Sequence, residues 1–180
     1  MEEKTLRCDE DGEAHLDHNS VLILSRGNLP YLQREFESII GPTAHSIIYS
    51  SGKDFAGAVE SNLREKIIHL WSKVSSRKVA ERMLKQFRQW GYGKAEIIEF
   101  DESEPRIKLK VENSANADGY SESDEPVCHF TRGILAGAVS VLFDQDMDCV
   151  ENKCIAQGDE YCEFEIMSAE NYSEQSIRVE

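Results

Sequence analysis

Four residues in the last third of the chain have side chains suited to holding a metal ion. Cys128, Cys154 and Cys162 offer three thiolates, and Glu151 offers a carboxylate. Zinc takes such ligands in tetrahedral structural sites, with bonds of about 2.3 Å to sulfur and about 2.1 Å to oxygen. The sequence therefore supplies a complete ligand set for one Zn2+ ion, if folding brings these residues together.

Two of these cysteines fall in an expected β-hairpin. Strands are expected at residues 147–156 and 161–167, because apolar and polar residues alternate there around a polar turn. If the turn centres on Gly158, Cys154 and Cys162 lie opposite each other on one face of the hairpin. The spacing thus predicts two neighbouring sulfur atoms.

The other two ligands depend on local backbone geometry. Glu151 precedes Cys154 by three residues, so strict alternation sends it to the other face unless the strand bends or bulges. Cys128 falls at the start of an expected helix, where the positive end of the helix dipole favours a thiolate. The site therefore requires a bulge in the first strand of the hairpin.

Other interpretations of these residues stay open from spacing alone. The cysteines of the hairpin could form a cross-strand disulfide or remain buried thiols, although five cysteines without a secretory signal favour thiols or metal ligands. His129 could replace Cys128 or Glu151 as a ligand, and Cys149 is a spare thiol. Cys8 has no cysteine or histidine at ligand spacing nearby and is expected to be free.

The periodicity of the remaining chain predicts an α+β fold, with an antiparallel sheet of about four to five strands packed against helices. Expected helices lie at residues 28–40, 43–70, 75–90 and 128–143, and further strands at 21–24, 94–100 and 106–111. In the first helix, one face is expected to point inward and consists of Leu29, Leu32, Phe36, Ile39 and Ile40.

Small residues make the helix at 128–143 slim on part of its surface, notably Gly133 and Gly137, and Gly52 lies in the long second helix. Such positions let another backbone or a ligand approach closely. A small hydrophobic ligand is expected between the slim helix and the sheet. Candidate pocket residues, each of which could equally be plain core, are Met83, Phe87, Ile107, Phe130, Ile134 and Cys149.

Composition limits the classes of partner. The chain has 180 residues, a net charge of -14 and a pI of about 4.8, which argues against nucleic acid or anionic membrane as its partner. No apolar run reaches the length of a membrane-spanning helix, and the charged N-terminus does not resemble a signal peptide. A cytoplasmic location without membrane insertion is expected.

The length fits one domain with a substantial core. Residues 1–19 are expected to be a flexible acidic tail, residues 20–168 the single ligand-binding domain, and residues 169–180 a C-terminal tail. The polar segment 112–125 is expected to be a solvated, flexible loop over the mouth of the pocket.

The cysteine-rich stretch resembles a known family, the 4-vinyl reductase domain. The resemblance is carried by Cys128, Gly133, Gly137 and the pattern Glu151-x-x-Cys154-x-x-x-Gly158-x-x-x-Cys162-x-Phe164. This family of small-molecule-binding modules also forms the sensor domains of phenol- and xylene-responsive bacterial activators. Its fold is similar to TRAPP vesicle-tethering subunits and, more distantly, to haem-based nitric-oxide sensor domains. The resemblance covers about residues 20–167, and its specific part is confined to 128–164.

The resemblance implies a structural zinc ion on Cys128, Glu151, Cys154 and Cys162, because the aromatic sensors bind zinc with residues at matching separations. This chain also departs from those sensors. It carries no ATPase domain and no helix-turn-helix, its third helix has no histidine, and the strand at 106–111 has no tryptophan. The pocket is therefore expected to be less polar and to take a ligand other than phenol.

These observations favour a regulatory domain that binds or senses a small hydrophobic or aromatic molecule, with one structural zinc and a homodimeric state. No dinucleotide fingerprint, Walker motif, HExxH or GxSxG elbow is present, so no enzyme activity is expected. The alternatives are a dimeric scaffold or tethering protein of TRAPP-like fold with a protein partner, or a reductase-like accessory protein in tetrapyrrole metabolism. The long second helix is the expected dimer surface.

Overall fold

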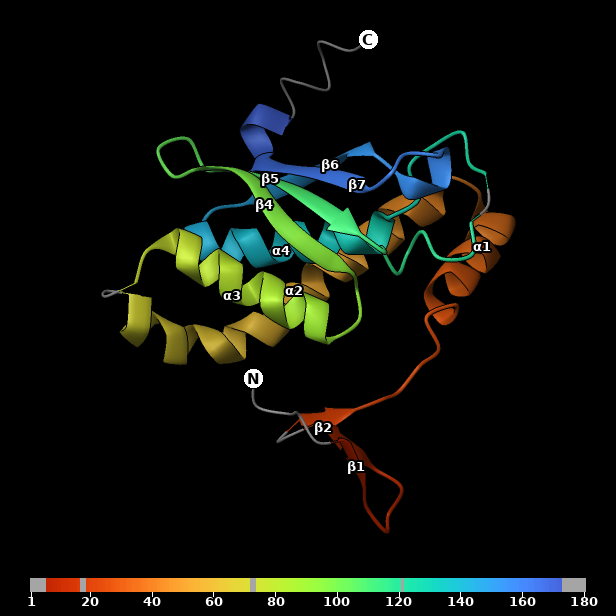
Figure 1. Cartoon of the computed structure of the whole chain (residues 1–180), viewed down its shortest axis with the longest axis horizontal. Helices are drawn as coiled ribbons and strands as arrows, with labels where there is room; N and C mark the ends of the chain where they lie inside the picture. The colour runs from red at the N-terminus through yellow and green to blue at the C-terminus, as the bar shows by residue number, and fades with distance from the viewer. Residues whose placement is uncertain (1–5, 17–18, 72–73, 121, 173–180) are drawn as a thin grey trace.

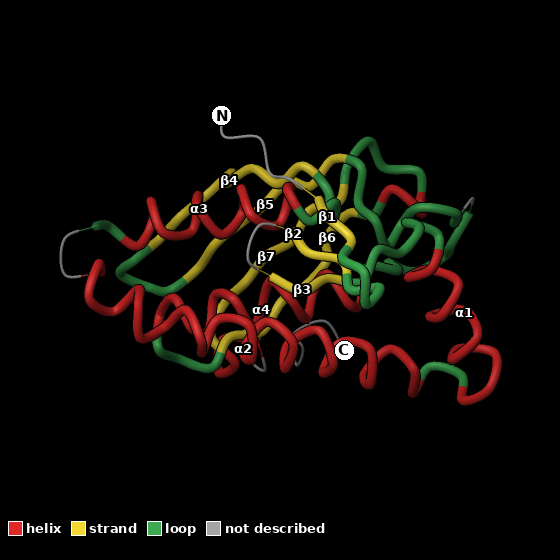
Figure 2. Tube along the Cα trace, turned by 90° about the horizontal axis from the view of Figure 1, so that it is seen from below, coloured by secondary structure: helices red, strands yellow, loops and turns green. Residues whose placement is uncertain are grey.

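The computed structural model describes residues 6–16, 19–71, 74–120 and 122–172, with only the backbone described at 19 and 58–71. Its main body is one antiparallel sheet with helices on one face (Figures 1 and 2). The helices are α1 Asn28–Ile40, α2 Thr43–Trp71, α3 Ser76–Gln89, α4 His129–Phe143 and the short 3-10 helix η1 Ile155–Gln157. The expected α+β fold is confirmed.

The main sheet has the strand order β4-β5-β7-β6. Its strands are β4 Lys94–Asp101, β5 Arg106–Glu112, β6 Met147–Lys153 and β7 Cys162–Ser168. On β5 the alternate residues Ile107, Leu109 and Val111 are buried, while Lys108 and Lys110 pair with glutamates on the other face. This alternation is why the sheet turns one apolar face to the helices.

The slim face of α4 packs against α2. A methyl group at Gly133 would collide with the backbone oxygen of Tyr49, and one at Gly137 would collide with the backbone oxygen of Lys53. Gly52 on α2 approaches the backbone of Phe130 in the same way. The small residues therefore serve helix packing, and a ligand between α4 and the sheet would have to contact other faces of α4.

The outward position of α1 differs from the expectation. Leu32, Phe36 and Ile39 are 49%, 47% and 74% exposed, whereas Pro30 and Gln33 are the residues buried on this helix. The physical reason is the placement of α1 at one end of the molecule, away from the sheet (Figure 1), where only the side with Gln33 faces the body. The apolar face predicted to be core is thus a surface feature.

The N-terminal residues contain regular structure where none was expected. Three short strands, β1 Leu6–Cys8, β2 Ala14–Leu16 and β3 Asn19–Val21, form an antiparallel sheet of their own. A polar turn starts it, in which the Asp9 carboxylate accepts hydrogen bonds from two backbone N–H groups. The strand expected at 21–24 is wrong beyond its first residue. The proposed division into tail, domain and tail remains a prediction, and 173–180 lie outside the described residues.

The segment before α4 is also more ordered than expected. Ser114 to Ala117 are buried, and the Thr131 hydroxyl of α4 donates a 2.6 Å hydrogen bond to the Asn116 side-chain oxygen. The expectation of a solvated loop at 112–125 is therefore wrong for its first part. Small alanine and serine side chains let this backbone pack against the start of α4.

Candidate metal centre

The first ligand position is set by the start of α4. Cys128 is the N-cap residue of this helix and is fully buried. Its backbone N–H donates a 3.0 Å hydrogen bond to one carboxylate oxygen of Glu151 on β6. The contact joins the positive end of the helix dipole to an acidic side chain, so helix and hairpin meet at this point.

A β-bulge brings Glu151 to the same face as the cysteines. In the β6–β7 ladder, Glu151 pairs with Phe164 and Lys153 pairs with Glu163, so Asn152 is the extra residue. The bulge shifts the alternation by one, and Glu151 is buried while Asn152 is exposed. The bulge that the metal hypothesis required is thus present in the structure.

The last two sulfurs come from the turn between β6 and β7. Strand β6 ends at Lys153, earlier than expected, and Cys154 begins the tight turn that includes η1. The backbone N–H of Cys154 donates to the Asp159 carboxylate at 2.9 Å, and Gly158 takes the left-handed conformation with φ of 96°. This turn holds Cys154 beside Cys162, the first residue of β7.

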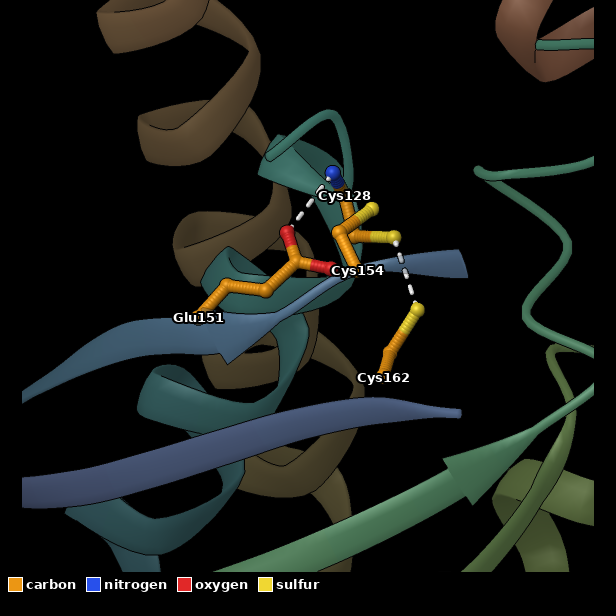
Figure 3. Close-up of side chains that lie close together, drawn as sticks. All are labelled: Cys128, Glu151, Cys154 and Cys162. Atoms are coloured by element: carbon orange, nitrogen blue, oxygen red, sulfur yellow. Dashed lines mark hydrogen bonds between the residues drawn. The ribbon is translucent and has the colours of Figure 1, made fainter. Parts of the chain in front are cut away.

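The four side chains converge in a buried cluster, which we call the cysteine cluster: Cys128, Glu151, Cys154 and Cys162 (Figure 3). One ligand atom from each lies within 4.8 Å of the others. The sulfurs of Cys128 and Cys162 are 3.7 Å apart, and the cysteines are free thiols. Neighbouring groups also touch the sulfurs: Ser114 Oγ lies 3.3 Å from that of Cys128, and the Ile155 N–H donates to that of Cys162 at 3.4 Å.

The protonation of the cluster is uneven. Burial raises the pKa of the Glu151 carboxyl to about 8, with the Cys154 thiolate adding to the effect. Burial also raises the pKa of the Cys128 thiol. Hydrogen bonds from Cys128 and Cys162 lower the pKa of Cys154, because they stabilise its thiolate. For Cys162, the contact with Cys128 lowers the pKa, but its hydrogen bond to Cys154 and its burial raise it overall.

The donor set fits a zinc ion. Glu151 Oε1 is buried and has no hydrogen-bond partner among the described residues, although it lies in a cluster of sulfur atoms that can ionise. An unpaired buried carboxylate oxygen is costly, and a cation bonded to it would remove that cost. Three thiolates and one carboxylate are ligands that zinc accepts in a closed tetrahedral site.

The alternative ligands lie outside the cluster. His129 is buried and stacks on His45 with a ring-centroid distance of 4.0 Å. Burial, followed by the nearby His45 and Arg132, lowers the pKa of His129 to about 3. Cys149 is fully buried in the core, and its thiol contacts the backbone oxygen of Val150. Cys8 is exposed on β1.

The six candidate pocket residues share one part of the core. Phe87, Ile107, Ile134 and Cys149 are buried in it, and Met83 and Phe130 pack against it half-buried. Tyr92, which the sequence did not single out, joins them: its ring lies 5.2 Å from that of Phe87 and 6.4 Å from that of Phe130. An aromatic residue between two glycines gave no periodic signal by which it could have been found.

The sheet with helices on one face and the buried cluster at its hairpin define an α+β domain of the 4-vinyl reductase type. Residues 107–168 match the model of this domain family, which confirms the family resemblance seen in the sequence. Among curated proteins, two uncharacterised proteins of Methanocaldococcus jannaschii are 27% identical over 85 residues and 28% identical over 119 residues. These matches cover 47% and 66% of this chain but only 50% and 62% of the relatives.

Solved structures support the same fold. The phenol-responsive sensory domain of the transcription activator PoxR is 17% identical, with a TM-score of 0.81 over 97% of this chain and 90% of that domain. A vinyl-4-reductase family protein of M. jannaschii is 23% identical, with a TM-score of 0.53 over 81% and 82%. A trafficking protein particle complex subunit 3 of Naegleria fowleri, covalently bound to palmitic acid, is 16% identical, with a TM-score of 0.54 over 79% and 96%.

Across the described residues, every helix is too short or too polar to cross a membrane.

Proposed function

We propose that this protein is a binding domain for a small hydrophobic molecule, with a structural zinc ion in the cysteine cluster. The observation that carries the zinc assignment is Glu151 Oε1, a buried acceptor without a partner among the described residues, placed with three cysteine sulfurs. With four protein ligands the ion has no open position for water, so its role is structural.

The zinc ion would join two elements that otherwise meet through few bonds. Cys128 starts α4, and the other three ligands belong to the β6–β7 hairpin. Because α4 and this hairpin both border the core that contains Ile134 and Cys149, the metal would fix the wall of a ligand site. Removing the metal is expected to loosen this corner before the rest of the domain.

The ligand site is proposed between α3, α4 and the sheet, since α2 already occupies the slim face of α4. Met83 and Phe87 come from α3, Phe130 and Ile134 from α4, and the strands contribute Ile107 and Cys149. Proteins of similar fold hold phenol or palmitic acid. The apolar and aromatic character of these residues favours a hydrophobic ligand, and none of the six provides the histidine or tryptophan expected for phenol.

Native mass spectrometry with metal analysis of the same sample tests the proposal. One zinc per chain together with an additional organic mass is the expected result. Zinc without any ligand, also after incubation with hydrophobic extracts, would contradict the binding role and favour a scaffold. A chain free of zinc after purification under reducing, metal-replete conditions would contradict the metal assignment.

A dimeric state is part of the proposal, and it is also the basis of the scaffold alternative. The stretch from Leu22 to Ile47 exposes an unusual number of large apolar side chains, which we call the apolar end face: Leu22, Ile23, Leu24, Tyr31, Leu32, Phe36, Ile39, Ile40 and Ile47. Contiguous apolar surface of this kind marks an interaction site. We propose that a second copy of the chain covers it, through α1 and the start of α2.

A further inference from the structure

We propose that Glu37, His45 and His129 form a second divalent-metal site, of different donor chemistry from the cysteine cluster. Each residue comes from a different helix: Glu37 from the last turn of α1, His45 from the first turn of α2, and His129 from the first residue of α4. One ligand atom from each lies within 4.8 Å of the other two. We call this group the histidine site.

The contacts within the histidine site are close. His45 Nε2 lies 3.3 Å from a Glu37 carboxylate oxygen. The ring of His129 stacks on that of His45 at 4.0 Å, with 20° between the planes. Two imidazoles and one carboxylate are ligands that zinc, cobalt and nickel accept, and three protein ligands leave a position open for a fourth.

Burial favours a specific site over a chance surface pair. His129 is only 6% exposed. The side chains of Glu37 and His45 are 26% and 28% exposed, so an ion could enter from solvent on their side. A site of this kind is reachable, yet most of its surroundings are fixed by packed helices.

A neighbouring glutamine supplies an independent indication of a missing ligand. Gln33 is 2% exposed, and its amide nitrogen donates to the Glu37 carboxylate at 2.9 Å and to the Val127 backbone oxygen at 3.0 Å. These two acceptors fix which end of the amide is nitrogen. Its oxygen is then left buried with no partner in the described part of the chain, although a buried acceptor normally has one. A metal ion, or a water bound to it, would satisfy that oxygen.

Binding has a structural cost that sets its strength. Arg132 Nη1 lies 3.5 Å from His129 Nδ1, so Nε2 is the nitrogen of His129 available to a metal. Stacked rings direct their nitrogens nearly parallel, and both must turn for their lone pairs to converge on one ion. The positive charge of Arg132 also opposes a cation. The histidine site is therefore expected to bind more weakly than the cysteine cluster and to lose the ring stack on binding.

Titration of Co2+ into the metal-free full chain under reducing conditions separates the two sites. Cobalt bound by thiolates gives strong near-ultraviolet charge-transfer absorption, whereas cobalt bound by imidazole and carboxylate gives weak visible bands alone. The expected result is a first equivalent with thiolate absorption and a second, weaker equivalent without it. Substitutions His45→Gln and Glu37→Gln should each weaken the second equivalent by about tenfold or more and leave the first unchanged.

The matched control is His15→Gln. His15 belongs to an exposed group with Asp9 and Glu13 that has the same kinds of donor atom, so a nonspecific surface effect would appear there. A second equivalent that is absent, or that survives His45→Gln at unchanged affinity, overturns the histidine site. Missing thiolate absorption on the first equivalent would instead contradict the zinc proposal, so the two failures are distinguishable.

Discussion

Glu151 has two carboxylate oxygens in different situations. Oε2 accepts the 3.0 Å hydrogen bond from the Cys128 N–H, and Oε1 is buried without a partner among the described residues. The raised pKa, about 8, reports the same conflict: burial disfavours the charged form, and the neighbouring Cys154 thiolate adds to it. A divalent cation bonded to both groups would reverse each of these effects, since opposite charge favours the ionised forms.

Removing one sulfur tests the metal assignment at the residue scale. Cys154→Ala is expected to abolish stoichiometric zinc and to lower the melting temperature, because a three-ligand remnant binds weakly and leaves Glu151 unpaired. The matched control is Cys149→Ala, which removes a thiol that is also 0% exposed but lies outside the cluster. That control should keep zinc and lose only about 1 kcal/mol of unfolding free energy. Equal zinc content in the two variants would contradict the assignment.

Proton release gives the pH dependence. At pH 7 the raised pKa values keep Cys128, Cys162 and Glu151 protonated in the metal-free cluster, while the lowered pKa of Cys154 leaves it ionised. Zinc needs the ionised form of each ligand, so binding should release about three protons. Affinity therefore rises with pH and is lost on acidification. Calorimetry in buffers of different ionisation enthalpy measures the count, and binding without proton release would contradict it.

At the scale of elements, the packing of α2 on α4 depends on hydrogen in place of a side chain. Gly133→Ala is expected to reduce the unfolding free energy by about 3 kcal/mol, because its methyl group meets the Tyr49 backbone oxygen and two rigid helices must separate. Gly57→Ala on α2 is the matched control, since a methyl group there meets nothing within 4 Å. It should stabilise the helix, by up to about 1 kcal/mol. Denaturant unfolding of both variants checks the opposite signs.

The helices and strands of the main body were predictable because their apolar residues repeat with clear periods. For α1, the expected bounds at 28–40 agree with Asn28–Ile40. Periodicity, however, identifies an apolar face without saying what covers it. Hence the face of α1 with Phe36 and Ile39 was assigned to the core although it is exposed.

The ligand positions of the cysteine cluster could be predicted only conditionally. Hairpin symmetry places Cys154 next to Cys162, but Glu151 reaches them only through the bulge at Asn152. Nothing in the local sequence requires that bulge, which follows from the register of the whole β6–β7 pair. The polar contacts of Ser114 and Gln33 were missed for a similar reason: each joins segments far apart in the chain.

At the scale of the whole molecule, the N-terminal strands and α1 lie at the margin of the main body (Figure 1). The apolar end face lies here, and its three consecutive residues Leu22, Ile23 and Leu24 are 82%, 58% and 52% exposed. Sequences rarely expose such a run without a partner. A two-fold symmetric contact would cover it with the same face of a second copy, whereas the net charge of -14 makes nonspecific association unfavourable.

Charge substitution on the apolar end face tests this contact. The wild-type chain should have twice its 20.4 kDa mass in light scattering coupled to size-exclusion chromatography. Ile39→Glu should give a monomer, because Ile39 is 74% exposed in the single chain and the new carboxylate would be buried only in the dimer. Ile98→Glu, at a 46% exposed isoleucine on β4, is the control that should stay dimeric. Circular dichroism should match wild type for both variants, since neither carboxylate enters the core. A dimer that persists in Ile39→Glu would place the interface elsewhere, and a monomeric wild type would leave the apolar end face to a different partner.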